Sequence, residues 1–539
     1  MPGRSVSAHG MFVPSASARS SDTARVERIR LAETLAALSL AGDLGHGQTL
    51  EHSLRVTYLA SILAERVQLG PAERREAFYV GLLQATGCVG NAHDTSALLH
   101  ADDIAFKHAI VRANFEGPAA QLRAVVRIAG TAGSAARRPA ALAAALSRPD
   151  APRMMARQHC EVAALIARRA GLGEGVERGL RALFERWDGR GAPDGQRGPG
   201  IPLATRLVQI GVAIDVANAD GGPDAAQALV AAASGAALDP ELAGACLELL
   251  RTRPPWDALG TPSLWEDVLA REPAAARVLL AVEELDTIAR AFADFADLKS
   301  PWFVGHSRGV ASLAEGAARA LHLSTDESTF IRRAALFHDV GRATVPNTVL
   351  DKPGPLTPGE RERVRLHAYY TERVLERSAG LAPYATVASA HHERLDGSGY
   401  PRRATLGGLS VGARILAGGD VLQALTEERP YRRAATLERA VAQLRGEGRA
   451  GRLDPEVIEA VVIASGAAPL GRVRASGLLS DREIEVVRLL SGGHSNKEIA
   501  RRLGISPNTA RHHLESLYAK LDVSTRTGAV MAALERGLL

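Results

Sequence analysis

The feature of this 539-residue sequence that most restricts its fold is an internal repeat. The segment 50–87 aligns with the segment 304–341 at an offset of 254 residues. Further along, His159 aligns with His367 and the offset has fallen to 208. Since 254 − 208 = 46, the first copy carries an insertion of 46 residues ahead of His159. The alignment predicts two tandem copies of one domain.

Both copies are predicted to be helical. Apolar residues recur three and four positions apart, as in RVTYLASILAERV (55–67), which is the spacing of a buried helix face. Turns rich in proline and glycine separate such segments, and no convincing run of alternating strand residues is present. We therefore expect a mostly α-helical chain with two helical bundles, at 25–250 and 276–470, joined by a linker at 251–275.

The composition narrows the class of protein. An apolar content of 46% is ordinary for a globular chain. The net charge of +5 permits nucleic-acid binding but is too small to indicate it. The three cysteines lack CxxC spacing, which favours a reducing compartment and argues against thiolate-bound zinc. Since no apolar run reaches about 18 residues, we expect no membrane span, a cytoplasmic location and a disordered polar leader at 1–24.

Seven imidazole and carboxylate donors are spread over separate helical segments of the second copy. They are His306, His338, Asp339, His367, His391, His392 and Asp420. Such donors suit zinc, iron, manganese or nickel. A helical bundle can direct side chains from several helices into one cavity, and seven donors are too many for one tetrahedral ion. The set therefore predicts two metal ions sharing a bridge, an arrangement that clamps a phosphate and activates a bridging water.

Four motifs surround these donors in a fixed order. They are HDVG (338–341), DKPGPLT (351–357), HHERLDGSGYP (391–401) and ALTEERPYR (424–432). Over about 298–462 the chain resembles the HD-GYP subfamily of HD-superfamily phosphohydrolases. The resemblance implies an HD-type helical bundle and a phosphodiesterase that linearises cyclic di-GMP. Its cofactors would be two divalent metal ions, iron or manganese, with zinc as a further option.

The resemblance also implies a role for individual residues. One ion would be held by His306, His338 and Asp420, and the other by His367, His391 and His392, with Asp339 as the bridge. Gly399, Tyr400 and Pro401 would shape the loop on the substrate side. Asp339 and Arg342 would be the catalytic residues. Arg342 stands where the family usually has lysine, so we expect it to bind substrate phosphate but not to exchange a proton.

The first copy keeps the frame of the second but not its donors. Gln84, Ala85, Leu183, Phe184 and Val212 stand where the second copy has His338, Asp339, His391, His392 and Asp420. Only His52 and His159 remain, which is too few for a metal pair. We expect a degenerate HD-GYP-like domain that is either a structural partner or a ligand-binding regulator. The AHD triplet at 92–94, inside the insertion, is interpreted as chance.

The segment 476–539 differs from both copies. Two helix starts have capping-box spacing, at SDRE (480–483) and SNKE (495–498). A third helix is expected to begin after GIS (504–506). Its predicted buried stripe consists of Ala510, Leu514, Leu517 and Leu521. Two helices joined by such a turn predict a helix-turn-helix, whose second helix enters the major groove of DNA.

Over 478–539 the sequence closely resembles the LuxR/NarL-type DNA-binding domain. The resemblance implies double-stranded DNA as a partner. The implied DNA contacts are Lys497, Thr509, Arg511, His512 and Lys520. Because paired half-sites need paired domains, a homodimer is also expected. The alternative is a protein-interaction module with a solvated cationic face.

Three functions are compatible with this organisation. The first is a transcription factor controlled by binding or turnover of a cyclic dinucleotide in the second copy. The second is chiefly a metal-dependent phosphodiesterase, with DNA binding secondary. The third is an inactive sensor or dimerisation scaffold that controls the DNA-binding domain. The complete set of seven donors argues against the strongest form of the third.

Overall fold

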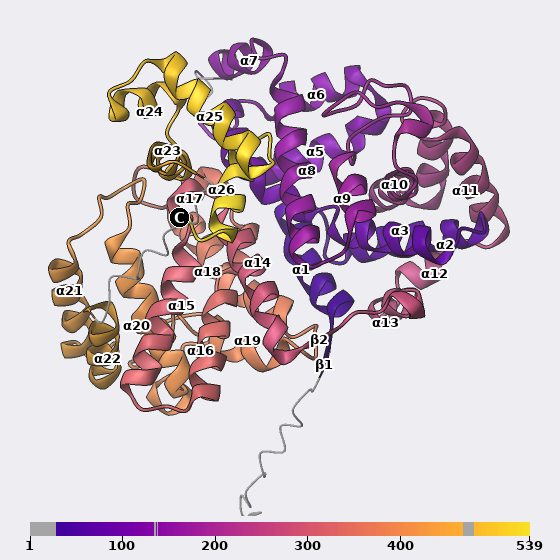
Figure 1. Ribbon diagram of the computed structural model, residues 1–539. Helices are drawn as coiled ribbons and strands as arrows, with labels where there is room; N and C mark the ends of the chain where they lie inside the picture. Colours follow the sequence, from indigo (N-terminus) through magenta and orange to yellow (C-terminus); the bar gives the residue numbers. More distant parts are fainter. Residues whose placement is uncertain (1–27, 134–135, 137, 467–478) are drawn as a thin grey trace, which may run out of the picture.

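The regular structure of the chain is almost entirely helical (Figure 1), which confirms the expected mostly α fold. The computed structural model describes residues 28–133, 136, 138–466 and 479–539. The predicted leader, 1–24, and the predicted start of the tail at 476 lie outside these residues. No helix in the described part of the chain has the length and apolar character needed to cross a membrane.

The first repeat is a helical bundle. In chain order its elements are α1 (Leu31–Gly45), α2 (His52–Arg66), α3 (Pro71–Leu83), η1 (Thr86–Asn91), α4 (Ala92–Leu99), α5 (Asp103–Glu116), α6 (Pro118–Ile128), α7 (Arg138–Leu146), α8 (Ala151–Arg169), α9 (Glu174–Arg181), η3 (Gly198–Gly200), α10 (Leu203–Ala233) and α11 (Pro240–Thr252). Helices α4 to α7 fall in the region of the insertion.

The second repeat has the same order of elements without the insertion. Its elements are α14 (Leu285–Asp297), η6 (Pro301–Phe303), α15 (His306–Ala320), α16 (Thr325–Phe337), η7 (Val340–Thr344), α17 (Asn347–Leu350), α18 (Pro358–Leu375), α19 (Ala382–Ser389), η8 (Leu406–Gly408), α20 (Val411–Thr426), α21 (Leu437–Arg449) and α22 (Pro455–Gly466). Helices α2 and α3 begin and end 254 residues before α15 and α16. Likewise, α9 and η3 precede α19 and η8 by 208 residues.

The two repeats pack on each other in a reciprocal way. Helix α1 of the first lies on α18 and η7 of the second, and α14 of the second lies on α8 and η1 of the first. One hydrophobic core runs through both, from Leu35 to Phe292, and continues to Val530 in the C-terminal domain. Because each repeat covers apolar surface of the other, burial stabilises the pair as one body.

The segment between the repeats is folded. It contains α12 (Trp256–Leu259), α13 (Leu264–Ala270), η4 (Ala274–Ala276), β2 (Leu279–Ala281) and η5 (Val282–Glu284). Helix α13 packs on α2, and β2 pairs antiparallel with β1 (Arg28–Arg30). These strands were not expected, because three residues are too few to show the alternation by which a strand is recognised.

Hydrogen bonds between largely buried polar groups connect the insertion to the second repeat. Asp103 of α5 accepts hydrogen bonds from Lys299 Nζ at 2.7 Å and from the amide of Asn347 at 2.8 Å. Although burial opposes ionisation, neighbouring lysines hold the pKa of Asp103 at about 2. His93, from the AHD triplet, has its Nδ1 2.9 Å from Oδ2 of Asp351. The triplet interpreted as chance therefore contributes an interface residue.

The described part of the C-terminal domain, residues 479–539, has four helices. They are α23 (Asp481–Ser491), α24 (Asn496–Leu503), α25 (Pro507–Leu521) and α26 (Arg526–Glu535). Ser480 and Ser495 form the predicted capping boxes, and Gly504 ends α24 in the left-handed conformation with φ 64°. The predicted stripe of Ala510, Leu514, Leu517 and Leu521 is buried. The sequence prediction for these helices is thus confirmed.

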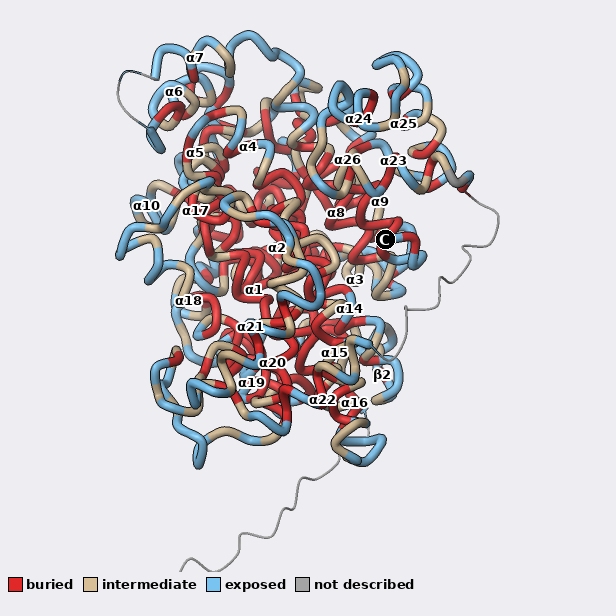
Figure 2. Tube along the Cα trace, turned by 90° about the vertical axis from the view of Figure 1, so that its left-hand side faces the viewer, coloured by how far each residue is buried: buried red, intermediate tan, exposed pale blue. Residues whose placement is uncertain are grey.

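Helix α26 packs against the repeats, whereas α24 and α25 face outward (Figures 1 and 2). Ahead of α26, Glu161 of α8 accepts hydrogen bonds from the amides of Ser524 at 2.7 Å and Thr525 at 3.0 Å. At the other end, guanidinium groups donate to the final carbonyls, Arg169 to Met531 and Arg308 to Leu534, each at 2.9 Å. Buried Asp294 pairs with both arginines. An anion at the N-terminus and cations at the C-terminus complement the helix dipole.

Candidate metal centre

The seven predicted donors converge at one point in the second repeat. His306 opens α15, His338 and Asp339 follow α16, His367 lies in α18, His391 and His392 follow α19, and Asp420 lies in α20. All are buried except His392, which is partly exposed. Two groups have all ligand atoms within 4.8 Å of one another, His306 with His338 and Asp339, and His367 with His391 and His392. Among the described residues these are the only groups of this kind.

Asp339 lies between the two groups and directs one carboxylate oxygen to each. Its Oδ2 is 2.9 Å from Nε2 of His338 and 3.7 Å from Nε2 of His306. Its Oδ1 is 3.3 Å from Nε2 of His367 and 3.6 Å from Nε2 of His391. This is the arrangement of a carboxylate that bridges two ions.

Asp420, on α20, also lies between the two groups. Its Oδ1 lies 3.2 Å from Nε2 of His306, and its Oδ2 lies 3.7 Å from Nδ1 of His392. Burial opposes ionisation of Asp420, but the hydrogen bond from His306 holds its pKa below the ordinary value. The carboxylate is therefore available as a ligand.

Three of the histidines are oriented by the same local device. Nδ1 faces the carbonyl oxygen three residues earlier in His338 (Ala335), His367 (Val364) and His391 (Ala388). Nδ1–H donates to that carbonyl, so Nε2 carries the lone pair and faces the centre. Such a partner fixes both the tautomer and the ring of a metal-binding histidine.

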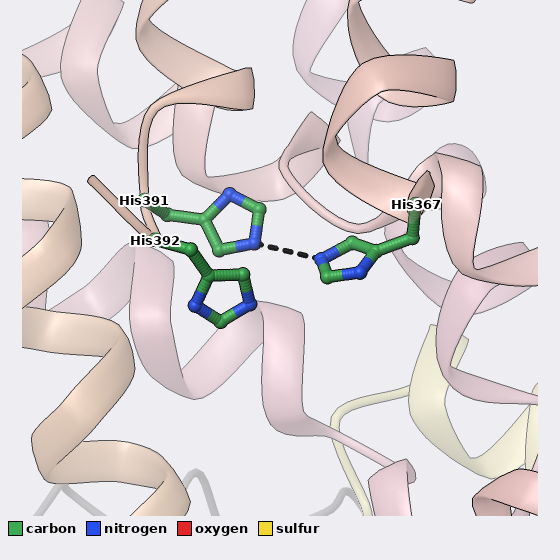
Figure 3. Close-up of side chains that lie close together, drawn as sticks. All are labelled: His367, His391 and His392. Atoms are coloured by element: carbon green, nitrogen blue, oxygen red, sulfur yellow. Dashed lines mark hydrogen bonds between the residues drawn. The ribbon is translucent and has the colours of Figure 1, made fainter. Parts of the chain in front are cut away.

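Two of these Nε2 atoms face each other. Nε2 of His367 and Nε2 of His391 are 3.0 Å apart, with His392 beside them (Figure 3). With both Nδ1 atoms acting as donors, neither Nε2 carries a proton for the other. Two imidazole nitrogens bound at right angles to one ion, each at about 2.1 Å, would be about 3.0 Å apart. The pair therefore has the geometry of two ligands of a single ion.

Buried polar atoms without a hydrogen-bond partner gather at this point. They are Nε2 of His338, Oδ1 of Asp339 and Nη1 of Arg342. Burial of such groups is costly unless something satisfies them. Lone pairs from imidazole and carboxylate converging on one buried point fit divalent metal ions.

The protonation states of the group His367, His391 and His392 suit a metal. Burial lowers the pKa of His391 to about 3, and it lowers the pKa of His367 and of His392 as well. Burial acts against ionisation of Asp339, but Arg342 and His338 hold its pKa well below the usual range. Neutral imidazoles and an ionised carboxylate are the forms that bind a cation. His306 differs, because Glu427 and Asp420 outweigh its burial and raise its pKa to about 10, so it must release a proton to bind an ion.

Glu427 is a further residue of the centre, which the sequence reading does not identify as functional. Its Oε2 lies 2.9 Å from Nδ1 of His306. Burial opposes ionisation of Glu427, whereas His306 and Arg429 hold its pKa at about 2. The carboxylate thus orients His306 so that Nε2 faces Asp420 and Asp339. Its place in the ALTEERPYR motif is the only sequence signal for it.

Arg342 lies at the edge of the centre and contacts Asp339 directly through Nη2. Its guanidinium carbon is 3.9 Å from the ring centroid of Phe303, and that of Arg429 is 4.5 Å from the same ring. One aromatic ring therefore contacts two cations, Arg342 beside Asp339 and Arg429 beside Glu427. Paired guanidinium groups are well suited to a phosphate.

The predicted substrate-side loop closes over the second histidine group. The ring of Tyr400 is 4.7 Å from that of His392 and 6.4 Å from that of His367. A Cβ at Gly399 would lie 2.5 Å from backbone atoms of residues 393 and 394, so no side chain fits there. Glu393 accepts hydrogen bonds from two amides of the loop, at 2.7 and 2.9 Å. Glu185 of the first repeat holds its own loop in the same way.

The corresponding point of the first repeat is filled by other groups. Nε2 of His159 is 2.6 Å from the carbonyl of Gln84, and the ring of His159 packs on Phe184. His52 directs Nδ1 to Asp215 at 2.6 Å, as His306 does to Glu427 in the second repeat. The imidazole of His159 is therefore held by groups of the protein itself, at the point where the second repeat has a predicted metal ligand.

The predicted DNA contacts lie on the outward side of the C-terminal domain. Lys497, Thr509, Arg511, His512 and Lys520 are all exposed. Lys520 also donates to Glu483 at 2.7 Å, and Arg511 donates to Glu515 at 2.8 Å. Packing of α26 on the repeats does not cover any of them.

Comparisons with known proteins agree with both parts of this description. A family model for the HD domain matches residues 290–457, and one for bacterial regulatory proteins of the luxR family matches 477–533. A 3'3'-cGAMP-specific phosphodiesterase 3 of Vibrio cholerae is 32% identical over 432 residues, 80% of this chain and 94% of that protein.

Two further similarities cover different lengths. A cyclic di-GMP phosphodiesterase response regulator of Xanthomonas campestris is 37% identical over 33% of this chain and 47% of its own length. A solved structure of a cyclic GMP-AMP-specific phosphodiesterase of V. cholerae matches with a TM-score of 0.58 and 29% identity. That match covers 82% of this chain and 99% of the solved chain, so it extends over both repeats.

Proposed function

Because this chain belongs to the HD-domain family, in its HD-GYP-type branch, and ends in a regulatory domain of the luxR family, we propose that it is a DNA-binding regulator with phosphodiesterase activity. Its second repeat would hydrolyse a cyclic dinucleotide with the help of two divalent metal ions. The names of its relatives support cyclic GMP-AMP and cyclic di-GMP as the substrates to test first.

The observation that carries the proposal is the position of Asp339 between two groups of imidazoles. His306, His338 and Asp420 would hold one ion, and His367, His391 and His392 the other. Iron, manganese or zinc bound there would supply Lewis acidity and an activated water. Arg342 would hold a non-bridging phosphate oxygen. Gly399, Tyr400 and Pro401 would shape the loop against which the substrate lies.

The test is metal content and turnover of two matched variants. His367→Ala should reduce bound metal and abolish hydrolysis of both cyclic dinucleotides. His159→Ala removes the equivalent histidine of the first repeat and should leave metal content and hydrolysis unchanged. Equal metal content in the two variants, measured by elemental analysis after anaerobic purification, would contradict the proposed centre.

Regulation of DNA binding is the second half of the proposal. Arg308, two residues after His306 in α15, donates to the last turn of α26, so the helix that opens with a predicted metal ligand also touches the DNA-binding domain. A cyclic dinucleotide should therefore change the affinity of the protein for DNA, and Asp339→Ala should remove that change. Unaltered DNA affinity in both experiments would leave an enzyme without control of transcription. A homodimer on paired half-sites stays a prediction.

A ligand sensor without turnover is the second candidate. The contact between Arg342 and Asp339 favours it, because a permanently charged guanidinium competes with the ions for the bridging carboxylate. Metal-loaded protein that binds a cyclic dinucleotide and leaves it intact would support the sensor. Hydrolysis would exclude it.

A further inference from the structure

We propose that a pocket beside the metal centre binds one nucleobase of the cyclic dinucleotide, with Tyr369, Arg365 and Arg403 as its recognition residues. The inference rests on the function proposed above and extends it to base recognition. The pocket has a volume of about 340 Å³ and lies between α18 and the loop at 397–403. This is within the usual range for small-molecule sites, about 300–1,000 Å³.

One face of α18 forms the first wall. Glu362, Arg365, Leu366 and Tyr369 line the pocket at the spacing of a single helix face. Leu366 and Tyr369 are 46% and 44% exposed, which is high for residues of their size next to a buried centre. His367 follows Leu366 directly and turns inward to the metal centre. The same helix therefore carries a candidate metal ligand on one face and the pocket wall on another.

Tyr400 forms the boundary between pocket and centre. It lines the pocket, and its ring is also 4.7 Å from that of His392. The guanidinium of Arg365 lies 5.4 Å from the Tyr400 ring centroid. A cyclic dinucleotide with one phosphate at the centre must direct its bases to the sides, and this pocket is adjacent to the centre.

The lining suits a planar base attached to an anionic backbone. Exposed aromatic surface offers a platform on which a base can stack. Guanidinium groups stack on bases and can also read two acceptors of guanine through paired hydrogen bonds. Arg365 and Arg403 stand on opposite walls, one on α18 and one on the loop.

The first repeat shows that the fold does not require Tyr369, Tyr400 or Arg403, whereas Arg365 has a counterpart in Arg157. At an offset of 208, Tyr369 corresponds to Glu161, Tyr400 to Ala192 and Arg403 to Gly195. The first-repeat face that contains Glu161 is occupied by the C-terminal domain through α26. The face with Tyr369 lines an open pocket instead.

The backbone conformation of Arg403 is a separate observation in favour of the pocket. Its φ is +56°, in the region that favours glycine, and the first repeat has Gly195 there with φ +74°. Residues other than glycine are uncommon at such a φ. An arginine in this conformation extends the cationic lining of the pocket. Replacement by glycine would restore the residue of the first repeat without altering the turn.

The test compares two substrates on metal-loaded, full-length protein. Tyr369→Ala and Arg403→Gly should each lower kcat/KM for the cyclic dinucleotide by about tenfold or more. Bis(p-nitrophenyl) phosphate, which has no nucleobase, should be hydrolysed at an unchanged rate. Arg373→Ala, on the exposed surface of α18 outside the pocket, is the control and should change neither.

Equal losses on both substrates, or no loss on the dinucleotide, would overturn the inference. Binding of a non-hydrolysable phosphorothioate cyclic dinucleotide, measured by calorimetry, separates this result from failure of the proposed function. If no diester is hydrolysed, the phosphodiesterase proposal fails, and the pocket still predicts weaker binding by both variants. If the wild-type protein does not bind the analogue, the pocket proposal fails even where the base-free diester is hydrolysed.

Discussion

Arg342 contacts through Nη2 the same Asp339 oxygen, Oδ2, that lies 2.9 Å from Nε2 of His338. A cation of the protein thus shares the carboxylate of Asp339, the predicted metal bridge, with another predicted ligand. A guanidinium stays charged at all working pH values, whereas lysine is a compact donor that can release a proton. This contact makes Arg342 the residue that distinguishes an active enzyme from a sensor.

We expect Arg342→Lys to raise kcat for cyclic dinucleotide hydrolysis by about tenfold or more, since proton transfer by a positioned side chain contributes factors of this size or larger. Steady-state kinetics on metal-loaded protein measure this. Arg342→Ala is the companion variant and should lower kcat. A lysine variant no faster than the wild type would show that position 342 does not limit turnover.

Glu427→Gln should weaken metal binding by about 10–100-fold, because the carboxylate that orients His306 and increases its basicity is lost. Metal titration of the apoprotein measures the change. Asp215→Asn removes the equivalent partner of His52 in the first repeat and should leave metal content unaltered. A similar loss of metal binding in the two variants would show that the effect comes from general destabilisation of the protein.

Buried Asp43 is expected to reduce stability as the pH rises from about 4 to 6. Burial raises its pKa from 3.8 to about 6, and hydrogen bonds from Ser53 offset this only in part. In that window the folded state holds a proton that the unfolded state has released, so the free energy of unfolding falls with rising pH. Above pH 6 Asp43 is ionised in both states, and the lost stability is not regained.

Asp43→Asn should therefore increase the free energy of unfolding by about 1–2 kcal/mol at pH 7, with a smaller gain at pH 4.5. Urea unfolding of the full chain at both pH values measures this. The exposed Asp224→Asn is the control and should change neither value. A gain that is the same at both pH values would contradict the assignment to Asp43.

Glu161→Gln should loosen the C-terminal domain from the repeats. The carboxylate accepts hydrogen bonds from the amides and hydroxyls of Ser524 and Thr525, and charged hydrogen bonds are worth about 1.5–3 kcal/mol each. Amide hydrogen exchange of α26 should rise by about tenfold or more. Glu174→Gln, which removes an exposed pair with Arg178 away from the C-terminal domain, should leave it unchanged.

The sequence by itself determined the mostly helical fold and the C-terminal domain. Periodicity, caps and the 254 and 208 offsets are local or self-comparing signals, so they can be read without coordinates. Ser480, Ser495 and the stripe through Leu514 are confirmed for this reason. The seven donors could also be proposed from the sequence, because their residue types and the order of the motifs around them are visible along the chain.

Only the tertiary structure decided which groups meet. Glu427 reaches His306 across 121 residues, and Glu161 reaches Ser524 across 363. Neither pair leaves a periodic or spacing signal, since both depend on how elements far apart in the chain pack together. The same holds for the pocket of Tyr369 and Arg403: helix and loop side chains combine into one lining only once α18 and the loop are folded against the metal centre. Long-range packing, which a single sequence does not encode in any local pattern, produced these contacts.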